Sequence, residues 1–299
     1  CWLGVSVCAY AKRTFSEMVL IDVDKDRAEG EAMDISHGAS FAGPMKIYAG
    51  GYEDVGDASI IVITAGANQK PNETRLDLVQ KNAKIMTDVV TQIKEQEYKG
   101  ILLIVSNPVD IMTQVAMEVS GFPEHRVFGS GTVLDSARLR YHLGQHLGVD
   151  SRSVHAFVIG EHGDSEIAAW SSANVSGVPL NSFCEMRGHF NHEGNTESIE
   201  EQVKNSAYEI IAKKDATYYG IAMVVKRICQ AIVRDEKSIF PISLRMHGEY
   251  ALEDVVLSMP AIVGARGIET TIPISLDEKE VSRLHESAEM LRETRKEIR

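Results

Sequence analysis

The sequence predicts an α/β fold in which a doubly wound parallel sheet is followed by an α+β domain. Three observations lead to this prediction. Short apolar runs alternate with longer segments of helical spacing in the first half, these runs contain almost no polar residues, and the rhythm changes after the segment Gly129–Thr132. Strands without polar residues are typical of parallel sheets covered by helices on both faces. We therefore place one domain at residues 1–128 and a second at residues 129–299.

The first half contains three predicted strands and two predicted helices. The apolar runs predict strands at Met18–Val23, Ser59–Thr64 and Ile101–Val105. Helical spacing predicts helices at Leu76–Glu97 and Ile111–Val119. Because strands and helices alternate, we expect the strands to be parallel.

The second half contains longer helices and fewer buried strands. Its patterns predict, in order, a helix at Leu134–Leu147, a strand at Val154–Ile159, helices at Ile199–Ala212 and Thr217–Val233, short strands at Ser238–Leu244 and Val255–Val263, and a charged amphipathic helix from Leu276 onward. This mixture is the reason for expecting an α+β domain here.

Composition and charge exclude several classes of partner. The chain has 299 residues, of which 44% are hydrophobic and 25% charged, as is ordinary for a globular protein. Its 31 basic and 43 acidic residues give a net charge of −12. Such a field repels nucleic acid and acidic membranes, so we expect neither as a partner. An anionic ligand would need an Arg or Lys placed at its site.

The cysteines and the absence of export signals favour a cytoplasmic protein. Cys1, Cys8, Cys184 and Cys229 are scattered without CxxC spacing, which is typical of reduced cysteines that pack in a cytosolic protein. No apolar run approaches the ~20 residues needed to span a bilayer, and no signal-peptide pattern opens the sequence.

Part of the pattern of a Rossmann-type dinucleotide site is present near the start. In such a site a Gly-rich turn follows the first strand, and an acid about 20 residues further on binds the adenine ribose. Asp22 ends a predicted strand 18 residues after Gly4, which suits the last glycine of the motif. The earlier glycines are absent, and a lone Asp at a strand end is more often a solvated cap.

Four polar segments carry the groups that could handle a small buried anion. They are a loop after a buried strand, the carboxyl end of another strand, one helix face and a Gly-flanked turn: Ala65–Arg75, Ser106–Asp110, Leu134–Arg140 and Gly160–Asp164. Ligands of open α/β sheets bind at the carboxyl ends of the strands. Asp135 and Arg138 are three residues apart and therefore share one face of their helix.

Each of these residues also has a simpler interpretation. Taken alone, His162 is typical of a satisfied turn histidine, and Asp135 with Arg138 of an ordinary helical ion pair. Arg75 alone is typical of a surface charge, and Thr217 alone of a helix N-cap.

A metal site is a further alternative at the Gly-flanked turn. His155, His162 and Asp164 are possible ligands, but the seven-residue spacing of the histidines is not a usual ligand pattern. No other ligand cluster stands nearby in the sequence, so we expect no metal.

Five segments, in order and spacing, resemble the lactate/malate dehydrogenase family, and within it the bacterial L-lactate dehydrogenases. They read NQKPNETR (68–75), SNPVD (106–110), LDSARLR (134–140), GEHGDSE (160–166) and ATYYGIAM (216–223). The resemblance extends from about Glu17 to the last helix. It implies an NAD-dependent enzyme that transfers hydride reversibly between NADH and pyruvate, giving L-lactate, in anaerobic glycolysis or fermentation.

The resemblance implies a catalytic role for four residues. His162 would give a proton to the substrate oxygen, and Asp135 would hold the histidine tautomer and stabilise the imidazolium. Arg75, on a loop that closes over the substrate, would polarise the carbonyl, and Asn107 would hydrogen-bond the reacting oxygen.

The resemblance also implies a substrate pocket. Arg138 would hold the substrate carboxylate with a bidentate fork, which Lys could not reproduce, and Thr217 would line the pocket. Malate dehydrogenases of this family place an Arg at the position of Gln69, where it pairs with a second carboxylate. A neutral Gln suits the methyl group of pyruvate. A malate or 2-hydroxyisocaproate dehydrogenase remains the alternative of the same class.

For NAD, the resemblance implies nine positions along the first half of the chain. They are Gly4, Asp22, Arg27, Tyr52, Gly66, Ala67, Val105, Asn107 and Ser130. The carboxylate of Asp22 would repel the 2′-phosphate of NADP, so NAD is the expected cofactor.

The sequence departs from the family pattern at its start and in one loop. Cys1 stands where a glycine is expected, and the segment between Gly4 and Asp22 is about two residues short of the family pattern. We therefore expect this sequence to lack most of the first strand, which makes a catalytically impaired relative a second alternative. Asn72 replaces a more usual Gly, and Asn tolerates left-handed backbone well.

Finally, the resemblance implies allosteric control. In the bacterial enzymes of this family an Arg and a His at the positions of Arg140 and His155 bind the phosphates of fructose 1,6-bisphosphate across an interface of a homotetramer. The simpler interpretation is that both residues are surface charges.

Overall fold

The computed structural model describes residues 15–42, 44–67 and 74–298. Three of the predicted positions, Gly4, Gln69 and Asn72, lie outside these residues. The expectation of a shortened first strand also falls outside them. For Arg75 the backbone is described but the side chain is not.

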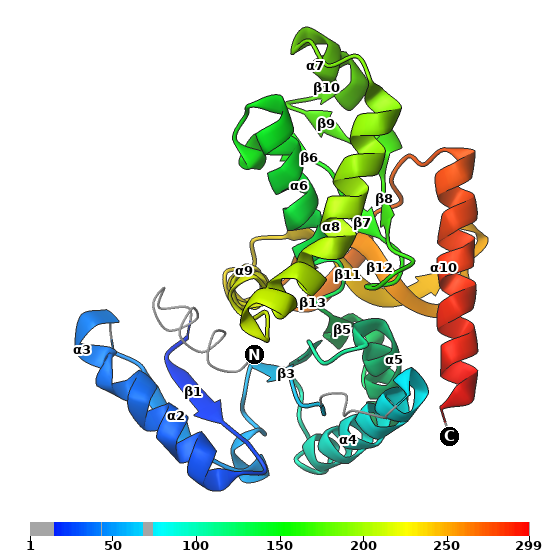
Figure 1. Ribbon diagram of the computed structural model, residues 1–299. Coiled ribbons are helices and arrows are strands. Elements are labelled where there is room, and N and C mark those ends of the chain that lie inside the picture. The colour runs from blue at the N-terminus through cyan, green and yellow to red at the C-terminus, as the bar shows by residue number, and fades with distance from the viewer. Residues whose placement is uncertain (1–14, 43, 68–73, 299) are drawn as a thin grey trace.

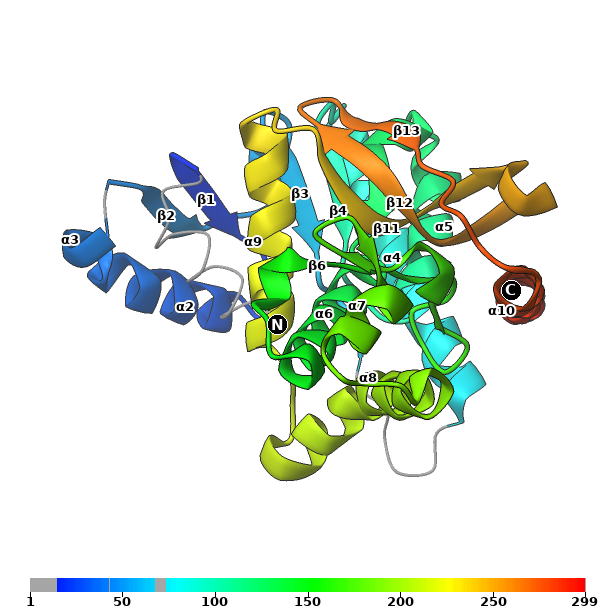
Figure 2. The ribbon, with the colours of Figure 1, turned by 90° about the horizontal axis from the view of Figure 1, so that it is seen from above.

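The centre of the molecule is a mixed sheet (Figures 1 and 2). Within the described residues its strand order is β13-β12-β11-β5-β4-β3. Three parallel strands come from the first half of the chain: β3 (Ile60–Ile63), β4 (Ile101–Ile104) and β5 (Val127–Gly129). Three antiparallel strands come from the second half: β11 (Ser238–His247), β12 (Glu253–Gly264) and β13 (Gly267–Thr271). This agrees with the predicted α/β class, since parallel strands from one half continue into antiparallel strands from the other.

A separate two-stranded unit precedes this sheet. It contains β1 (Glu17–Leu20) and β2 (Lys46–Ala49), which pair in parallel, together with α2 (Lys25–His37) and α3 (Ala39–Ala42). Leu20, Ala32 and Ile35 form its own small core. In the described part of the chain this pair of strands has no ladder to the six-stranded sheet, and Figure 1 shows it standing apart at the lower left.

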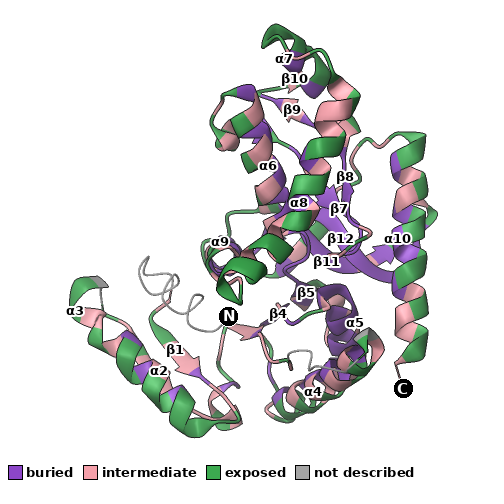
Figure 3. Cartoon of the chain, in the orientation of Figure 1, coloured by how far each residue is buried: buried purple, intermediate pink, exposed green. Residues whose placement is uncertain are grey.

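Long helices pack against the central sheet. They are α4 (Arg75–Glu95), α5 (Val109–Ser120), α9 (Tyr219–Val233) and α10 (Glu278–Glu297). A capping box starts α4, because Thr74 Oγ1 accepts from the Asp77 amide at 3.1 Å. Most of α5, which contacts β5, β11 and β12, is buried and is coloured purple in Figure 3.

The remaining elements form a second layer around α6 (Val133–Leu147) and α8 (His192–Lys214). The short strands are β6 (Val154–His155), β7 (Val158–Ile159), β8 (Ile167–Ala168), β9 (Asn174–Val175) and β10 (Val178–Pro179), and α7 spans Leu180–Met186. Single 3₁₀ turns lie at Tyr52–Asp54, Glu124–Arg126, Ser151–Ser153, Trp170–Ser172 and Glu249–Ala251. Leu139, Leu143 and Ile199 belong to the apolar cluster that joins α6 to α8.

One predicted strand, Val154–Ile159, is wrong in detail. The structure divides it into β6 and β7, which pair with β9 and β8 in two different small sheets. Ala156 and Phe157 lie between them, and the Phe157 carbonyl accepts from the Ala169 amide at 2.9 Å. The sequence pattern cannot reveal this change of partner, because Val154, Val158 and Ile159 are all buried apolar residues.

The main apolar cluster draws on both halves of the sequence, from Ile63 to Leu291. The division at residue 128 therefore stays a prediction. Among the described residues, no helix combines the length and apolar character needed to cross a membrane.

Candidate active site

The site begins at the turn that leads from β5 into α6. Gly131 has φ +50°, and a Cβ there would lie 2.6 Å from the Ser243 amide nitrogen of β11. Only glycine accepts both this backbone and this close approach. The turn starts α6 against the sheet, so that Asp135 lies in its first turn and is buried.

Asp135 joins the two cationic residues predicted from the sequence. One carboxylate oxygen lies 2.6 Å from His162 Nδ1, and the other accepts from an Arg138 guanidinium nitrogen at 2.8 Å. The side chain of Asp135 is 3% exposed, that of Arg138 13% and that of His162 26%. Because Asp135 occupies Nδ1, Nε2 is the ring nitrogen of His162 that is left to exchange a proton.

The surroundings of His162 favour its imidazolium form. Burial disfavours the charge, but the Asp135 carboxylate, helped by Asp110 and Glu166, raises the pKa of His162 to about 9. Burial also opposes ionisation of Asp135, yet His162 and Arg138 hold its pKa below the usual value. His162 is therefore protonated below about pH 9, and its side chain remains 26% exposed.

The backbone of His162 is held by a residue to which the sequence analysis gave no role. The His162 amide donates to Asp110 Oδ2 at 2.7 Å. The other oxygen of Asp110 accepts from Ser243 Oγ at 2.6 Å and from Ser258 Oγ at 3.3 Å. Burial raises the pKa of Asp110 to about 6. SNPVD includes Asp110, but its partners are more than 50 residues away, so spacing could not assign them.

A second residue without a predicted role, Asn82 on α4, links two loops at the carboxyl ends of β3 and β4. Asn82 Oδ1 accepts from the Ala67 amide at 2.8 Å, and its Nδ2 donates to the Asn107 carbonyl at 3.0 Å. Asn82 is 4% exposed. A polar residue on the buried face of a predicted helix was the only available signal.

Glu166 is the third such residue. It is 5% exposed, and the ligand atoms of Asp135, His162 and Glu166 all lie within 4.8 Å of one another. This spacing alone would suit a metal ion, and it shares only His162 with the metal alternative considered from the sequence. Both oxygens of Asp135 are already bonded to His162 and Arg138, so we interpret the group as one that handles protons.

Four predicted cofactor positions follow the carboxyl ends of parallel strands. Gly66 and Ala67 come after β3, Val105 after β4 and Ser130 after β5. The Val105 amide donates to the Ile63 carbonyl at 2.8 Å, and the Ser130 amide to the Ile104 carbonyl at 2.8 Å, so the loops leave the sheet in parallel. This is the edge at which α/β sheets bind nucleotides.

The predicted donors suit NAD and are divided between this edge and the separate β1–β2 unit. Asn107 is exposed beyond β4, and Asp22 lies partly exposed beyond β1, where its carboxylate accepts from the Asp24 amide at 3.0 Å. That bond uses Oδ1 and leaves Oδ2 as an acceptor suited to ribose hydroxyls. Arg27 is exposed on the first turn of α2, and Tyr52 packs partly buried against the main core.

The pair formed by Asp135 and His162 is called the dyad below. The structure does not show every predicted residue in contact with it. Arg75 begins α4, and its side chain lies outside the described part of the protein. Thr217 is half-buried in the connection between α8 and α9, and Tyr218 rather than Thr217 is the N-cap of α9. The N-cap interpretation of Thr217 is therefore wrong.

The two predicted effector residues lie close together in the fold. Arg140 Nε donates to the Ala156 carbonyl at 3.0 Å, and its guanidinium lies 5.2 Å from the Phe157 ring centroid. His155, which precedes Ala156, is exposed. Arg140 therefore sits beside the strand that carries His155.

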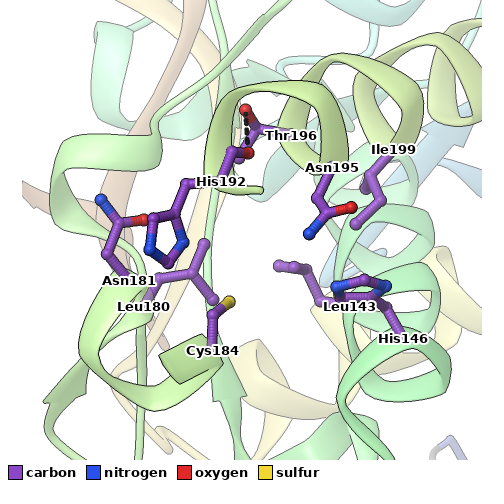
Figure 4. A pocket seen from close by; sticks show the side chains of 9 residues that line it. All are labelled: Leu143, His146, Leu180, Asn181, Cys184, His192, Asn195, Thr196 and Ile199. Atoms are coloured by element: carbon purple, nitrogen blue, oxygen red, sulfur yellow. Dashed lines mark hydrogen bonds between the residues drawn. The ribbon is translucent and has the colours of Figure 1, made fainter. Parts of the chain in front are cut away.

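A small pocket further along α6 is distinct from this site. Figure 4 shows nine residues around it: Leu143, His146, Leu180, Asn181, Cys184, His192, Asn195, Thr196 and Ile199. Leu143 and His146 each lie eight residues, or about two turns, beyond Asp135 and Arg138 on α6. It contains no residue predicted as functional.

The carboxyl edge of parallel strands, a histidine with a raised pKa and a largely buried arginine together are the arrangement expected of a dinucleotide-dependent oxidoreductase that acts on a small anion. The chain belongs to the lactate/malate dehydrogenase family. The NAD binding domain of that family matches residues 4–129, and its alpha/beta C-terminal domain matches residues 132–299.

Individual relatives agree with this assignment. The L-lactate dehydrogenase of Acetivibrio thermocellus is 48% identical over 93% of this chain and 88% of its own length. The L-lactate dehydrogenase of Synechococcus sp. is 46% identical over 98% of this chain and 95% of its own.

Solved structures match equally well. A lactate dehydrogenase from a Medee basin deep-sea metagenome library superposes with a TM-score of 0.95 at 44% identity, covering 99% of this chain and 94% of the other. The minor L-lactate dehydrogenase of Enterococcus mundtii, in its ligands-bound form, gives 0.95 at 40% identity, covering 100% and 96%. The predicted family and fold class are thus confirmed, and with them the oxidoreductase class and NAD as cofactor.

Proposed function

We propose that the protein is an NAD-dependent L-lactate dehydrogenase that interconverts pyruvate and L-lactate. The observation that carries the proposal is the buried Asp135 carboxylate, bonded at once to His162 and Arg138. Asp135 thereby holds a proton donor, His162, and an anion-binding group, Arg138, next to each other, where both could contact one small substrate. The L-lactate dehydrogenases named above support the choice of substrate.

In the proposed reaction, the His162 imidazolium gives its Nε2 proton to the ketone oxygen of pyruvate, and neutral His162 takes that proton back from lactate. When bound, NADH supplies the hydride and NAD accepts it. Asp135 stabilises the charged ring, and Arg138 binds the substrate carboxylate. Among the described residues, Arg138 shows no acceptor besides Asp135, so the rest of its fork is available for that carboxylate.

The remaining residues are assigned by position. Asn107, exposed beyond β4, binds the reacting oxygen, and Arg75 at the start of α4 polarises the carbonyl. Thr217 lines the pocket and Gln69 faces the substrate methyl. The residues proposed to hold NAD are Asp22, Arg27, Tyr52 and the loops after β3, β4 and β5, together with Gly4, which lies outside the described residues.

The direct test is NADH oxidation with a panel of 2-oxo acids. Pyruvate should give the highest kcat/KM, ahead of oxaloacetate and of branched 2-oxo acids. A preference for oxaloacetate would indicate a malate dehydrogenase, and a preference for 2-oxoisocaproate would indicate a 2-hydroxyisocaproate dehydrogenase. No oxidation with any of them would indicate an impaired relative.

The identity of residue 69 gives a sharper prediction. Gln69→Arg should move the preference from pyruvate toward oxaloacetate by roughly a hundredfold in the ratio of kcat/KM, because a bidentate charge partner is gained for the second carboxylate. Gln69→Leu is the matched control, which changes the side chain but adds no charge. An Arg variant that keeps the pyruvate preference would mean that residue 69 does not face the substrate.

We further propose that the enzyme is a cytoplasmic homotetramer of glycolysis or fermentation, activated by fructose 1,6-bisphosphate at Arg140 and His155. Several apolar side chains support an assembled state, because they are large and exposed: Tyr141, Tyr219 and Met223. Clustered cations at a subunit interface would be bridged by the two phosphates of the sugar.

The effector should lower the apparent KM for pyruvate by about 5-fold to 150-fold, the usual range of allosteric coupling. Titrating it at subsaturating pyruvate, with fructose 6-phosphate as the control that lacks one phosphate, measures the effect. A rate and a tetramer stability that both stay unchanged would contradict the allosteric proposal and leave the dehydrogenase proposal intact.

A further inference from the structure

Glu166 is a buried carboxyl beside the dyad that the proposed reaction does not use. It is 5% exposed, and one of its carboxylate oxygens lies within 4.8 Å of a carboxylate oxygen of Asp135 and of a ring nitrogen of His162. Asp135 and Glu166 thus both lie near the His162 side chain, in addition to Asp110 at its backbone amide, whereas orienting the ring requires only one carboxylate.

The charged groups that face Glu166 come from three further elements. From α6 come Asp135 and Arg138, and from α8 comes Lys204. From α10, Arg283 donates to the Glu166 main-chain carbonyl at 3.4 Å rather than to its carboxylate.

The cations around Glu166 are already paired with other carboxylates. Lys204 lies 3.4 Å from Glu200, which also pairs with Arg283. Arg138 is bonded to Asp135. No described cation is therefore dedicated to Glu166.

The charge balance of a loaded site follows from these pairs. Arg138, imidazolium His162 and the Arg75 proposed for this site contribute three positive charges. Asp135, the carboxylate of pyruvate and, above its pKa of about 6, Asp110 contribute three negative ones. These six charges cancel. An ionised Glu166 would leave a net negative charge in a buried site and would repel the incoming anion.

We propose that Glu166 is an electrostatic positioning residue that carries a proton whenever the anionic substrate binds, so that pyruvate binding requires two protonated groups rather than one. The proposal rests on the proposed function and deepens it. Burial, together with the negative charge of Asp135, raises the pKa of Glu166 to about 8, which agrees with the geometry.

The test is the pH dependence of kcat/KM for pyruvate from about pH 6 to about pH 10, in the wild type and in Glu166→Gln. With His162 and Glu166 both required in protonated form, the wild-type value should fall about a hundredfold per pH unit on the far alkaline side. Glu166→Gln is permanently neutral, so its value should fall only about tenfold per pH unit.

Two further variants separate this role from a structural one. Glu166→Asp keeps a titratable group and should keep the steeper fall. Glu161→Gln removes another buried carboxylate from the same loop and should also keep it. A purely structural role of Glu166 would lower the whole Gln profile without changing its steepness, and that result would overturn the proposal.

The wild-type profile is decisive even where Glu166→Gln does not fold. A wild-type fall of only about tenfold per pH unit up to about pH 10 also overturns the role of Glu166. Absence of pyruvate reduction at every pH would instead refute the proposed function. The two failures are therefore distinguishable.

Discussion

Replacing Asp135 by Asn should lower kcat/KM for pyruvate by about a thousandfold, because a histidine that loses its orienting carboxylate adopts the wrong tautomer. The substituted amide could still hydrogen-bond His162 Nδ1, but it could not stabilise the imidazolium across the 2.6 Å contact. The substitution would also leave the nearby Arg138 without its carboxylate partner at 2.8 Å. Steady-state kinetics of pyruvate reduction would measure the loss.

The same variant should change the pH profile. In the wild type the His162 pKa is about 9, so imidazolium is available for reduction below that pH and is lost above it. Lactate oxidation needs the neutral ring and should respond in the opposite sense. Asp135→Asn removes the main group that raises the pKa of His162, so the pH profiles of pyruvate reduction and of lactate oxidation should both move to lower pH.

A surface aspartate provides the control for this experiment. Asp150 forms an exposed pair with Arg152, and Asp150→Asn should leave the rate and the profile unchanged. Unshifted profiles in Asp135→Asn, or parallel profiles in the two directions, would contradict the role of His162 as the proton carrier.

Arg138→Lys should raise the KM for pyruvate by about a hundredfold or more, with a smaller effect on kcat. The side chain of Arg138 is only 13% exposed, and one guanidinium nitrogen donates to Asp135. The direction of its remaining N–H donors is therefore fixed. A lysine keeps the charge but offers a single point of contact, and mispairing a buried carboxylate costs several kcal/mol. Initial rates over a range of pyruvate concentrations separate KM from kcat.

Arg152→Lys is the matched control, because it makes the same change in an exposed arginine. Its KM should equal that of the wild type. If Arg138→Lys bound pyruvate as tightly as the wild type, the substrate carboxylate would have to bind elsewhere.

The apolar strands could be predicted from the sequence because burial on both faces leaves a plain signal. β3 and β4 each lie within one residue of the predicted ends. β5 was missed, since three residues give no periodicity, and β11 and β12 are longer than predicted. Their length is supported by pairing with each other rather than by any local pattern.

The site was predictable only as far as local motifs reach. Asp135 and Arg138 share a helix face, so their pairing could be anticipated from spacing. The approach of His162 to Asp135 followed from family resemblance. The contacts of Asp110, Asn82 and Glu166 depend on tertiary packing, so they could not be predicted from the spacing of residues in the sequence.

The anchoring of His162 through Asp110 has a consequence for biosynthesis. Asp110 reaches Ser243 across 133 residues of sequence and Ser258 across 148. Contacts so distant along the chain form late, because their loop-closure entropy must be overcome before they stabilise anything. A nascent chain that has left the ribosome only as far as His162 therefore carries every member of the dyad but lacks the hydroxyls that fix its anchor. Assembly of the reactive geometry must wait for the antiparallel strands β11 and β12, so that competence for chemistry is among the last properties this polypeptide acquires as it is made.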